Sequence, residues 1–322
     1  MEDRQISNHS AQPGLFKLIL RTFRLRQWVK SGFIVAPALF SLRFLEAGIW
    51  LDLLAGVLGF SLISSAIYAL NDVLNRQEDA VHPVKKNRPV ASGALSAGSA
   101  LTAGAVALAL GLTLLYLGGR HGELLWGPAS VWIGIGYVIL MVLYSLYLRR
   151  LQIVDLLVVA TGFVLRIMAG AAIVHEPVSS WLLLCTFTIA LFLGLIKRRQ
   201  EIAALEGNNL PARTALMDYP PLNIIDGWIS VLMAMTLLCY CLYTLDPQTV
   251  AKHHTQGLIY TIPFVIYGVF RYHKLALSGR SGEDPTELVI KDTGIKLTVV
   301  LWALAVYLIL YLKFLSRVNP GL

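Results

Sequence analysis

Charged side chains are scarce in this sequence. Only 14% of its 322 residues are Asp, Glu, Lys or Arg, whereas 56% are hydrophobic. Soluble domains carry roughly 25% charged residues, so this composition excludes an ordinary soluble protein and indicates an integral membrane protein. Cysteine is also rare, and Cys185, Cys239 and Cys241 all lie within apolar runs. Their spacing matches no metal-binding or redox motif, which predicts packed thiols.

A cleavable signal peptide is a second feature that the sequence lacks. Residues 1–14 are polar, and the first long apolar run is preceded by a basic segment and followed by no small-residue cleavage site. We expect a disordered N-terminus over residues 1–14 and a single transmembrane domain over residues 15–322. Residues 15–30 alternate apolar and basic side chains with helical spacing, which predicts an interfacial amphipathic helix.

Apolar runs of about 20 residues, the length that a helix needs to cross the hydrocarbon core, recur along the chain. They predict an all-α bundle of nine transmembrane helices, over residues 31–48, 51–70, 97–117, 126–147, 153–174, 180–196, 226–246, 257–272 and 296–314. If the N-terminus is cytoplasmic, 21 of the 27 Lys and Arg residues fall in inside segments and five fall outside. This asymmetry favours that orientation. It also accounts for the net charge of +8 without any nucleic-acid partner, and it predicts attraction to anionic membrane lipids.

The densest polar block directly follows the second apolar run. On one continuous helix, which turns about 100° per residue, five oxygen-bearing side chains share one face: Asn71, Asp72, Asn75, Glu78 and Asp79. A solvated helix end would also favour Asn and Asp, but five such residues on one face favour a binding site. Mg²⁺ commonly takes one or two carboxylates together with substrate phosphates. The block therefore predicts a magnesium and polyphosphate site at the cytoplasmic face.

Two basic stretches complement this acidic face. The first follows within ten residues and contains Lys85, Lys86 and Arg88. Such cations clamp phosphate oxygens, and arginine can do so with two parallel hydrogen bonds. The second follows the sixth predicted span and contains Lys197, Arg198, Arg199 and the acidic Glu201. One acidic and one basic cluster suit a metal-chelated diphosphate together with a second, bare phosphate.

Arg166 lies in the middle of the fifth predicted span. An ionisable residue inside a membrane span is by default a candidate for function, which favours a catalytic or substrate role. The alternative is a structural contact with backbone carbonyls or with Asp155, although about three helical turns separate the two residues. Tyr144 is either a residue of the interfacial aromatic belt or a substrate-binding residue.

The segment from Asn71 to Asp79 resembles the first Asp-rich motif of the UbiA superfamily of membrane prenyltransferases, NDxxDxxxD. Asn71, Asp72 and Asp79 match this pattern, whereas Asn75 stands where the family has Asp. The resemblance implies a UbiA-type bundle in which Asn71, Asp72, Asn75 and Asp79 hold Mg²⁺. The substitution at Asn75 removes one charge from the metal ligands.

A second motif separates branches of the superfamily. Typical members carry DxxxD after the sixth span, where this chain has the cationic stretch from Lys197 to Arg199. Other runs are similar to the decaprenyl-phosphate phosphoribosyltransferase branch: Arg26 to Lys30, His82 to Gly93, Tyr144 to Arg149, Gly162 to Arg166 and Lys197 to Glu201. Arg149 stands where that branch more often has Lys.

This branch implies transfer of 5-phosphoribose from phosphoribosyl diphosphate (PRPP) to a polyprenyl phosphate, with release of diphosphate. The product would serve lipid-linked pentose and cell-envelope synthesis at a bacterial-type inner membrane, and a homo-oligomer is compatible with the family. The resemblance assigns catalysis to Asp72, Asp79 and Arg166. The substrate-binding residues that it implies are Lys30, Lys85, Lys86, Arg88, Tyr144, Arg149, Lys197, Arg198, Arg199 and Glu201.

Two other functions remain open at this point. An aromatic prenyltransferase of the same superfamily would be expected to carry the second DxxxD motif, which is replaced here. A lipid or small-molecule transporter would be expected to spread polar residues through the middle of the membrane. In this chain they cluster at one predicted face, which favours an enzyme.

Overall fold

The computed structural model describes residues 14–41, 43–122, 127–208, 219–278, 289 and 291–318. The predicted disordered N-terminus lies outside this part of the chain, apart from Gly14. The described residues form helices and no strands, in agreement with the expected all-α class.

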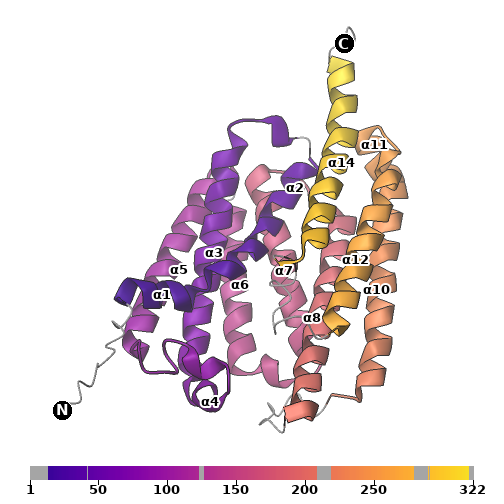
Figure 1. The fold of residues 1–322 in the computed structure, drawn as a ribbon. Coiled ribbons are helices and arrows are strands. Elements are labelled where there is room, and N and C mark those ends of the chain that lie inside the picture. The colour runs from indigo at the N-terminus through magenta and orange to yellow at the C-terminus, as the bar shows by residue number, and fades with distance from the viewer. Residues whose placement is uncertain are drawn as a thin grey trace, which may run out of the picture.

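Seven helices are long and apolar enough to cross a membrane. They are α3 (Ile49–Leu74), α5 (Ala97–Gly119), α6 (Ala129–Leu146), α7 (Val154–Val174), α8 (Ser180–Asn208), α10 (Leu222–Leu245) and α14 (Thr293–Val318). Each coincides with one of the nine predicted spans. Figure 1 shows these helices side by side, with α7 between the α3–α5–α6 group and the group formed by α8, α10, α14 and the shorter α12 (Ile262–Leu277).

The two remaining predicted spans are divided into shorter pieces, so a count of nine spanning helices is not confirmed for the described residues. Residues 31–48 fall in η1 (Leu25–Val35), α2 (Ala36–Leu39) and η2 (Arg43–Leu45). Residues 257–272 fall in η5 (Gly257–Thr261) and α12 (Ile262–Leu277). Both α2 and α12 carry a proline, Pro37 or Pro263, in their first turn. Proline lacks the N–H that would continue a preceding helix, so it starts a new one instead.

Short helices cover the two ends of the bundle. They are α1 (Leu15–Phe23), α4 (Arg76–Val81), η3 (Lys85–Asn87), η4 (Leu148–Arg150) and α11 (Pro247–His253). In Figure 1, α1 lies crosswise to the long helices, while α4 and α11 lie at opposite ends. The helix expected over residues 15–30 ends early, because Arg24 adopts a left-handed conformation with φ of 52°. The apolar side chains of Leu15 and Phe16 are exposed on α1, as an interfacial helix requires.

Small residues allow the central helices to approach closely. A Cβ atom added to Gly111 on α5 would lie 2.7 Å from the carbonyl oxygen of Gly59 on α3. A Cβ atom added to Gly170 on α7 would lie 2.1 Å from the carbonyl oxygen of Ile34. Such contacts leave no room for larger side chains, and they replace the hydrophobic driving force that lipid surroundings do not supply. They fix the positions of α3, which carries Asp72, and of η1, which directly follows Arg24.

Gly111 offers a direct test of this packing. We expect Gly111→Leu to lower the stability by about 1–3 kcal/mol, because the new side chain meets the backbone of Gly59 and both the backbone and the side chain of Ile63. The matched control is Gly136→Leu on α6, since a Cβ atom at Gly136 has no neighbour within 4 Å. Thermal unfolding of the detergent-solubilised protein measures the difference. Equal melting temperatures for the two variants would contradict the close packing of α3 on α5.

Candidate active site

The predicted five-residue oxygen face is divided by a break in the helix. Helix α3 ends at Leu74, Asn75 has non-helical angles of φ −98° and ψ 12°, and α4 begins at Arg76. The expectation of one uninterrupted helix is therefore wrong, and the reason is that Asn75 caps α3 and ends it. Asp72, Asn75 and Asp79 remain buried, whereas the side chain of Glu78 is 60% exposed.

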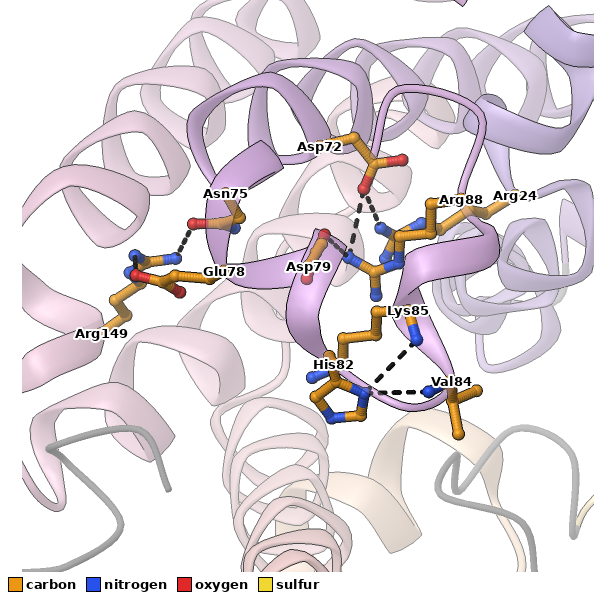
Figure 2. A network of polar contacts seen from close by, with 10 residues as sticks. All are labelled: Arg24, Asp72, Asn75, Glu78, Asp79, His82, Val84, Lys85, Arg88 and Arg149. Carbon is orange, nitrogen blue, oxygen red and sulfur yellow. Dashed lines mark hydrogen bonds and ion pairs between the residues drawn. The ribbon is translucent and has the colours of Figure 1, made fainter. Parts of the chain in front are cut away.

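Asp72 and Asp79 converge on one arginine. Nη1 of Arg88 donates to Oδ2 of Asp79 at 2.6 Å and lies 3.3 Å from Oδ1 of Asp72 (Figure 2). Arg88 reaches them from the chain that follows η3, which explains why a residue nine positions beyond Asp79 returns to it. Burial is the main factor that lowers the pKa of Arg88 from its ordinary value, and the nearby charge of Arg24 acts in the same direction. Arginine nevertheless stays charged, because its unperturbed pKa is so high.

Arg24 is a site residue that was not predicted from the sequence. Its guanidinium pairs with Oδ1 of Asp72 and lies 5.0 Å from the ring centroid of Tyr68. The left-handed turn at Arg24 joins α1 to η1 and directs the side chain to α3. The hydroxyl of Ser65 on α3 donates to the carbonyl oxygen of Phe23 at 3.1 Å, which also holds this turn against α3. Arg24 is one of several basic residues in an amphipathic segment, and no feature of the sequence distinguishes it from the others as a site residue.

Asn75 turns to a different partner. Nη1 of Arg149 donates to Oδ1 of Asn75, and Nη2 of Arg149 lies 3.5 Å from Oε1 of Glu78. In Figure 2 the Asn75 oxygen points toward Arg149, whereas Asp72 and Asp79 point toward Arg88. Arg24 and Arg88 thus hold Asp72 and Asp79, whereas a separate cation, Arg149, holds Asn75.

The other predicted residues of this end lie around the cluster. Asn71 is half-buried in the last turn of α3, and Lys30 is half-buried on η1. Lys85 is half-buried and Lys86 is exposed, both on η3. Nδ1 of His82 accepts from the backbone N–H of Val84 at 3.2 Å and of Lys85 at 3.3 Å, which shapes the turn that carries these lysines.

Arg198, from the second basic stretch, is buried in a cluster of its own. Nε of Arg198 donates to Asp155 at 2.7 Å, Nη1 pairs with Glu201, and Nη2 donates to the Tyr144 hydroxyl at 3.4 Å. The hydroxyl of Tyr219 donates to the other oxygen of Asp155 at 3.0 Å. Burial raises the pKa of Tyr219 above its ordinary value, and the Asp155 carboxylate adds to this effect. Tyr144 thus lies beside Arg198 and Glu201, whereas Tyr219 was not predicted as a residue of this cluster.

Arg199 points to the opposite side of α8. Its guanidinium binds both oxygens of Asp226 on α10, with Nη2 to Oδ2 at 3.0 Å. Lys197 is half-buried on the same helix. The cationic stretch is therefore largely balanced by Asp155, Glu201 and Asp226, two of which are far from it in sequence. Both clusters lie at the end of the bundle that carries α4 and the C-terminal part of α8 (Figure 1).

Arg166 lies deeper in the bundle. Its nitrogens donate to the carbonyl oxygen of Gly162 at 2.7 Å and to the hydroxyls of Ser64 and Tyr137, each at 3.0 Å. Three aromatic rings surround the guanidinium, at 5.1 Å (Phe60), 4.8 Å (Tyr137) and 5.4 Å (Phe163) from their centroids. These contacts agree with the structural alternative, in which Arg166 binds a backbone carbonyl oxygen inside the bundle. The other partners of Arg166 are two hydroxyls, and Asp155 pairs instead with Arg198. A catalytic role for Arg166 stays a prediction.

An apolar cavity of about 360 Å³ lies among α2, α7, α8, α10, α12 and α14. Its lining includes Phe33, Ile167, Leu193, Tyr240 and Trp302. Leu193 lies one helical turn before Lys197, and Phe33 lies three residues after Lys30, so each lysine shares a helix face with a residue that lines the cavity. Polar groups of the site and an apolar space are therefore adjacent.

The donor set fits Mg²⁺. Two buried carboxylates lie within 3.3 Å of one cationic nitrogen of Arg88, so a single cation can contact both. Among the described residues, no three His, Cys, Asp or Glu side chains gather as a metal site built from protein alone would require. Two carboxylates with remaining positions for phosphate oxygens are the usual arrangement for Mg²⁺.

Comparison with known proteins identifies the fold. A model of the UbiA prenyltransferase family matches residues 33–286. Over 307 residues the chain is 27% identical to a decaprenyl-phosphate phosphoribosyltransferase of Corynebacterium glutamicum, covering 91% of this chain and 87% of that protein. Identity to a decaprenyl-phosphate phosphoribosyltransferase of Mycobacterium tuberculosis is 28% over 288 residues, with coverages of 88% and 91%.

A solved structure agrees with this assignment. A UbiA homologue from Archaeoglobus fulgidus, bound to GPP and Mg²⁺, superposes with a TM-score of 0.64 at 16% identity. The superposition covers 91% of this chain and 99% of the archaeal chain. At this identity the likeness speaks for the fold alone, and the expected UbiA-type helical fold is confirmed.

The contact of Arg24 with Asp72 predicts that α1 and η1 depend on this ion pair. We expect Arg24→Ala to speed hydrogen exchange of residues 15–35 by about tenfold or more, since a hydrogen bond to a charged group contributes about 1.5–3 kcal/mol. Exchange measured by mass spectrometry tests this, with Arg21→Ala as the control because Arg21 is exposed on α1. Unchanged exchange in Arg24→Ala would show that the ion pair does not hold the segment.

Proposed function

This chain belongs to the UbiA prenyltransferase family, and from that premise we propose that it transfers 5-phosphoribose from PRPP to a polyprenyl phosphate. The observation that carries the proposal is the convergence of Asp72 and Asp79 on one cation, together with the cationic stretch from Lys197 to Arg199 where typical members of the family carry a second acidic motif. Such a site suits one metal-chelated diphosphate. Relatives named decaprenyl-phosphate phosphoribosyltransferase, matched over most of their length, support it.

Asp72 and Asp79 would hold Mg²⁺, with Asn71 as a neutral oxygen ligand. Bound Mg²⁺ would neutralise negative charge on the leaving diphosphate. The Mg²⁺-bound homologue of the same fold supports the use of a divalent metal. Arg88 would exchange its carboxylate partners for diphosphate oxygens, and Lys85 and Lys86 would add positive charge from η3.

Lys30 and Lys197 would bind the phosphate of the lipid, because each shares a helix face with a residue that lines the apolar cavity, Phe33 or Leu193. Part of the polyprenyl chain would occupy that cavity. Arg198, oriented by Glu201 and Tyr144, would bind the 5-phosphate end of PRPP, and Arg199 would keep α8 in place through Asp226. The ribose would then lie between the two phosphate groups.

The chemistry requires little from side chains beyond positioning. A phosphate oxygen of the lipid forms a bond to C1 of ribose, and the bond from C1 to the diphosphate oxygen breaks, with both electrons leaving on diphosphate. The nucleophile is already ionised, so no strong base is needed. Catalysis would rest on alignment of the two substrates and on stabilisation of the leaving group by fixed cations. The site would face the cytoplasm of a bacterial-type inner membrane, where PRPP is available.

An assay with two arms tests this function. Membranes containing the protein are incubated with PRPP labelled in its ribose, Mg²⁺ and a polyprenyl phosphate. We expect label to enter the lipid phase and the transfer to stop when EDTA removes the metal. If no label enters the lipid, yet a prenyl diphosphate and an aromatic acid give product, the aromatic prenyltransferase is the correct function.

Substitutions of the carboxylates test the metal site within the same assay. We expect Asp72→Asn or Asp79→Asn to reduce transfer by about 100-fold or more, because each removes a charge that holds the metal against the leaving group. Asp52→Asn is the matched control, since Asp52 lies in the first turn of α3, at the opposite end of the same helix. Transfer that survives Asp72→Asn with its Mg²⁺ dependence intact would remove Asp72 from the site.

A further inference from the structure

Asn75 and Arg149 are the two residues at which this chain differs most clearly from the family motifs, and they touch each other. Asn75 stands where the Asp-rich motif has Asp, and Arg149 stands where the related branch more often has Lys. They are 74 positions apart in sequence, yet Nη1 of Arg149 donates to Oδ1 of Asn75. Two departures that meet in space indicate one altered unit and not two unrelated changes.

The chemistry of arginine fixes the orientation of the Asn75 amide. A guanidinium carries only donors, so the Asn75 atom that contacts Arg149 must be the oxygen. The NH2 group of Asn75 therefore lies on the other branch of the amide, and Arg149 cannot accept from it. Asn75 is 6% exposed, which leaves its amide little freedom to turn over.

The same contact makes the Asn75 oxygen a poor metal ligand. A metal ion on Oδ1 would have to displace the guanidinium of Arg149, as it would displace Arg88 from Asp72 and Asp79, but those two carboxylates carry a negative charge that attracts the metal. Asp72 and Asp79 face a different cation, Arg88, so the metal position that they define does not require Asn75. The neutral amide also carries no charge to offset a second cation.

We propose that Asn75 is a hydrogen-bond donor to an oxygen of the PRPP diphosphate, and that Arg149 is the positioning residue that holds it in this orientation. The inference rests on the proposed function and replaces the metal-ligand role that the family motif implies for Asn75. An amide NH2 beside Mg²⁺ suits a diphosphate oxygen, which accepts from a donor and is repelled by a carboxylate. Asn75 and Arg149 together would thus bind the diphosphate directly, at a position of the motif where an Asp would bind the metal ion.

Equilibrium binding to the full-length protein in detergent separates the two roles of Asn75. Mn²⁺, followed by electron paramagnetic resonance, reports on the metal, and radiolabelled inorganic diphosphate at saturating Mg²⁺ reports on the anion. We expect Asn75→Ala to leave Mn²⁺ affinity within about twofold and to weaken diphosphate binding about tenfold, as for a lost hydrogen bond to a charged group. Asp72→Asn, by contrast, should weaken Mn²⁺ binding by about tenfold or more.

Three further variants test the role of Arg149. Arg149→Ala should weaken diphosphate binding about as much as Asn75→Ala, and the double variant should add little, since both changes remove one interaction. Arg149→Lys should restore most of the affinity, because lysine can also donate to the Asn75 oxygen. Asp52→Asn, at the opposite end of α3, is the control and should change neither affinity.

Asn75→Asp guards against a folding defect, because it has the same shape and keeps the contact with Arg149. We expect it to weaken diphosphate binding by at least about tenfold, since it replaces a donor with a negative charge. The inference is overturned if Asn75→Ala weakens Mn²⁺ binding as Asp72→Asn does, or if diphosphate binding is unchanged in Asn75→Ala.

The ribose-transfer assay shows whether only the inference about Asn75 is wrong or whether the proposed function is wrong as well. If the unaltered protein transfers ribose label and Asn75→Ala binds diphosphate normally, only the inference about Asn75 fails. If the unaltered protein neither binds diphosphate nor transfers label, the proposed function and the inference fail together.

Discussion

Two buried carboxylates at the end of a membrane helix must each meet a cation, and the pairing of Asp72 and Asp79 with Arg88 meets this constraint. Removing one partner of a buried pair leaves an uncompensated charge, which costs about 3–5 kcal/mol. The turn through η3 returns Arg88 to the helix, and the left-handed turn at Arg24 brings a second cation to Asp72. The local chain path around the site therefore follows from its electrostatics. A metal-bound diphosphate would enter a site that already holds positive charge in place.

Close helix packing makes this arrangement geometrically possible. Gly59 and Gly111 bring α3 and α5 into backbone contact, and Gly170 lets η1 pass directly over α7. Because these contacts are between backbones, they set the position of α3 along the bundle relative to the neighbouring helices. Larger side chains at Gly59, Gly111 or Gly170 would push α3 away from α5 or η1 away from α7. The apolar interior thus determines which polar groups meet at the surface.

The sequence predicted the residue types of the site better than their partners. Asp72, Asp79 and Arg88 were identified because their side-chain chemistry and spacing are local features of one segment. Arg24, Asp155 and Tyr219 depend on crossings between segments that are distant in sequence, and no local pattern encodes those crossings. The break at Asn75 was missed for another reason: helical periodicity continues across it, although an Asn cap can end a helix within any such pattern. Similarly, Pro37 and Pro263 divide apolar runs whose composition alone resembled continuous spans.

The balance of charge gives a physical basis for the choice of substrate. A site with two acidic clusters can hold several metal ions around one diphosphate, and bare cations are then less important. Here Asn75 stands in place of an acidic residue and contacts Arg149, and the stretch from Lys197 to Arg199 stands in place of a second acidic motif.

This basic stretch is itself largely neutralised, because its arginines pair with Asp155, Glu201 and Asp226. Its arginines are held in fixed positions by carboxylates, and fixed donors bind phosphate without the entropy loss of ordering long side chains. Such a site favours substrates with phosphates at defined separations, as PRPP and a lipid phosphate together would present.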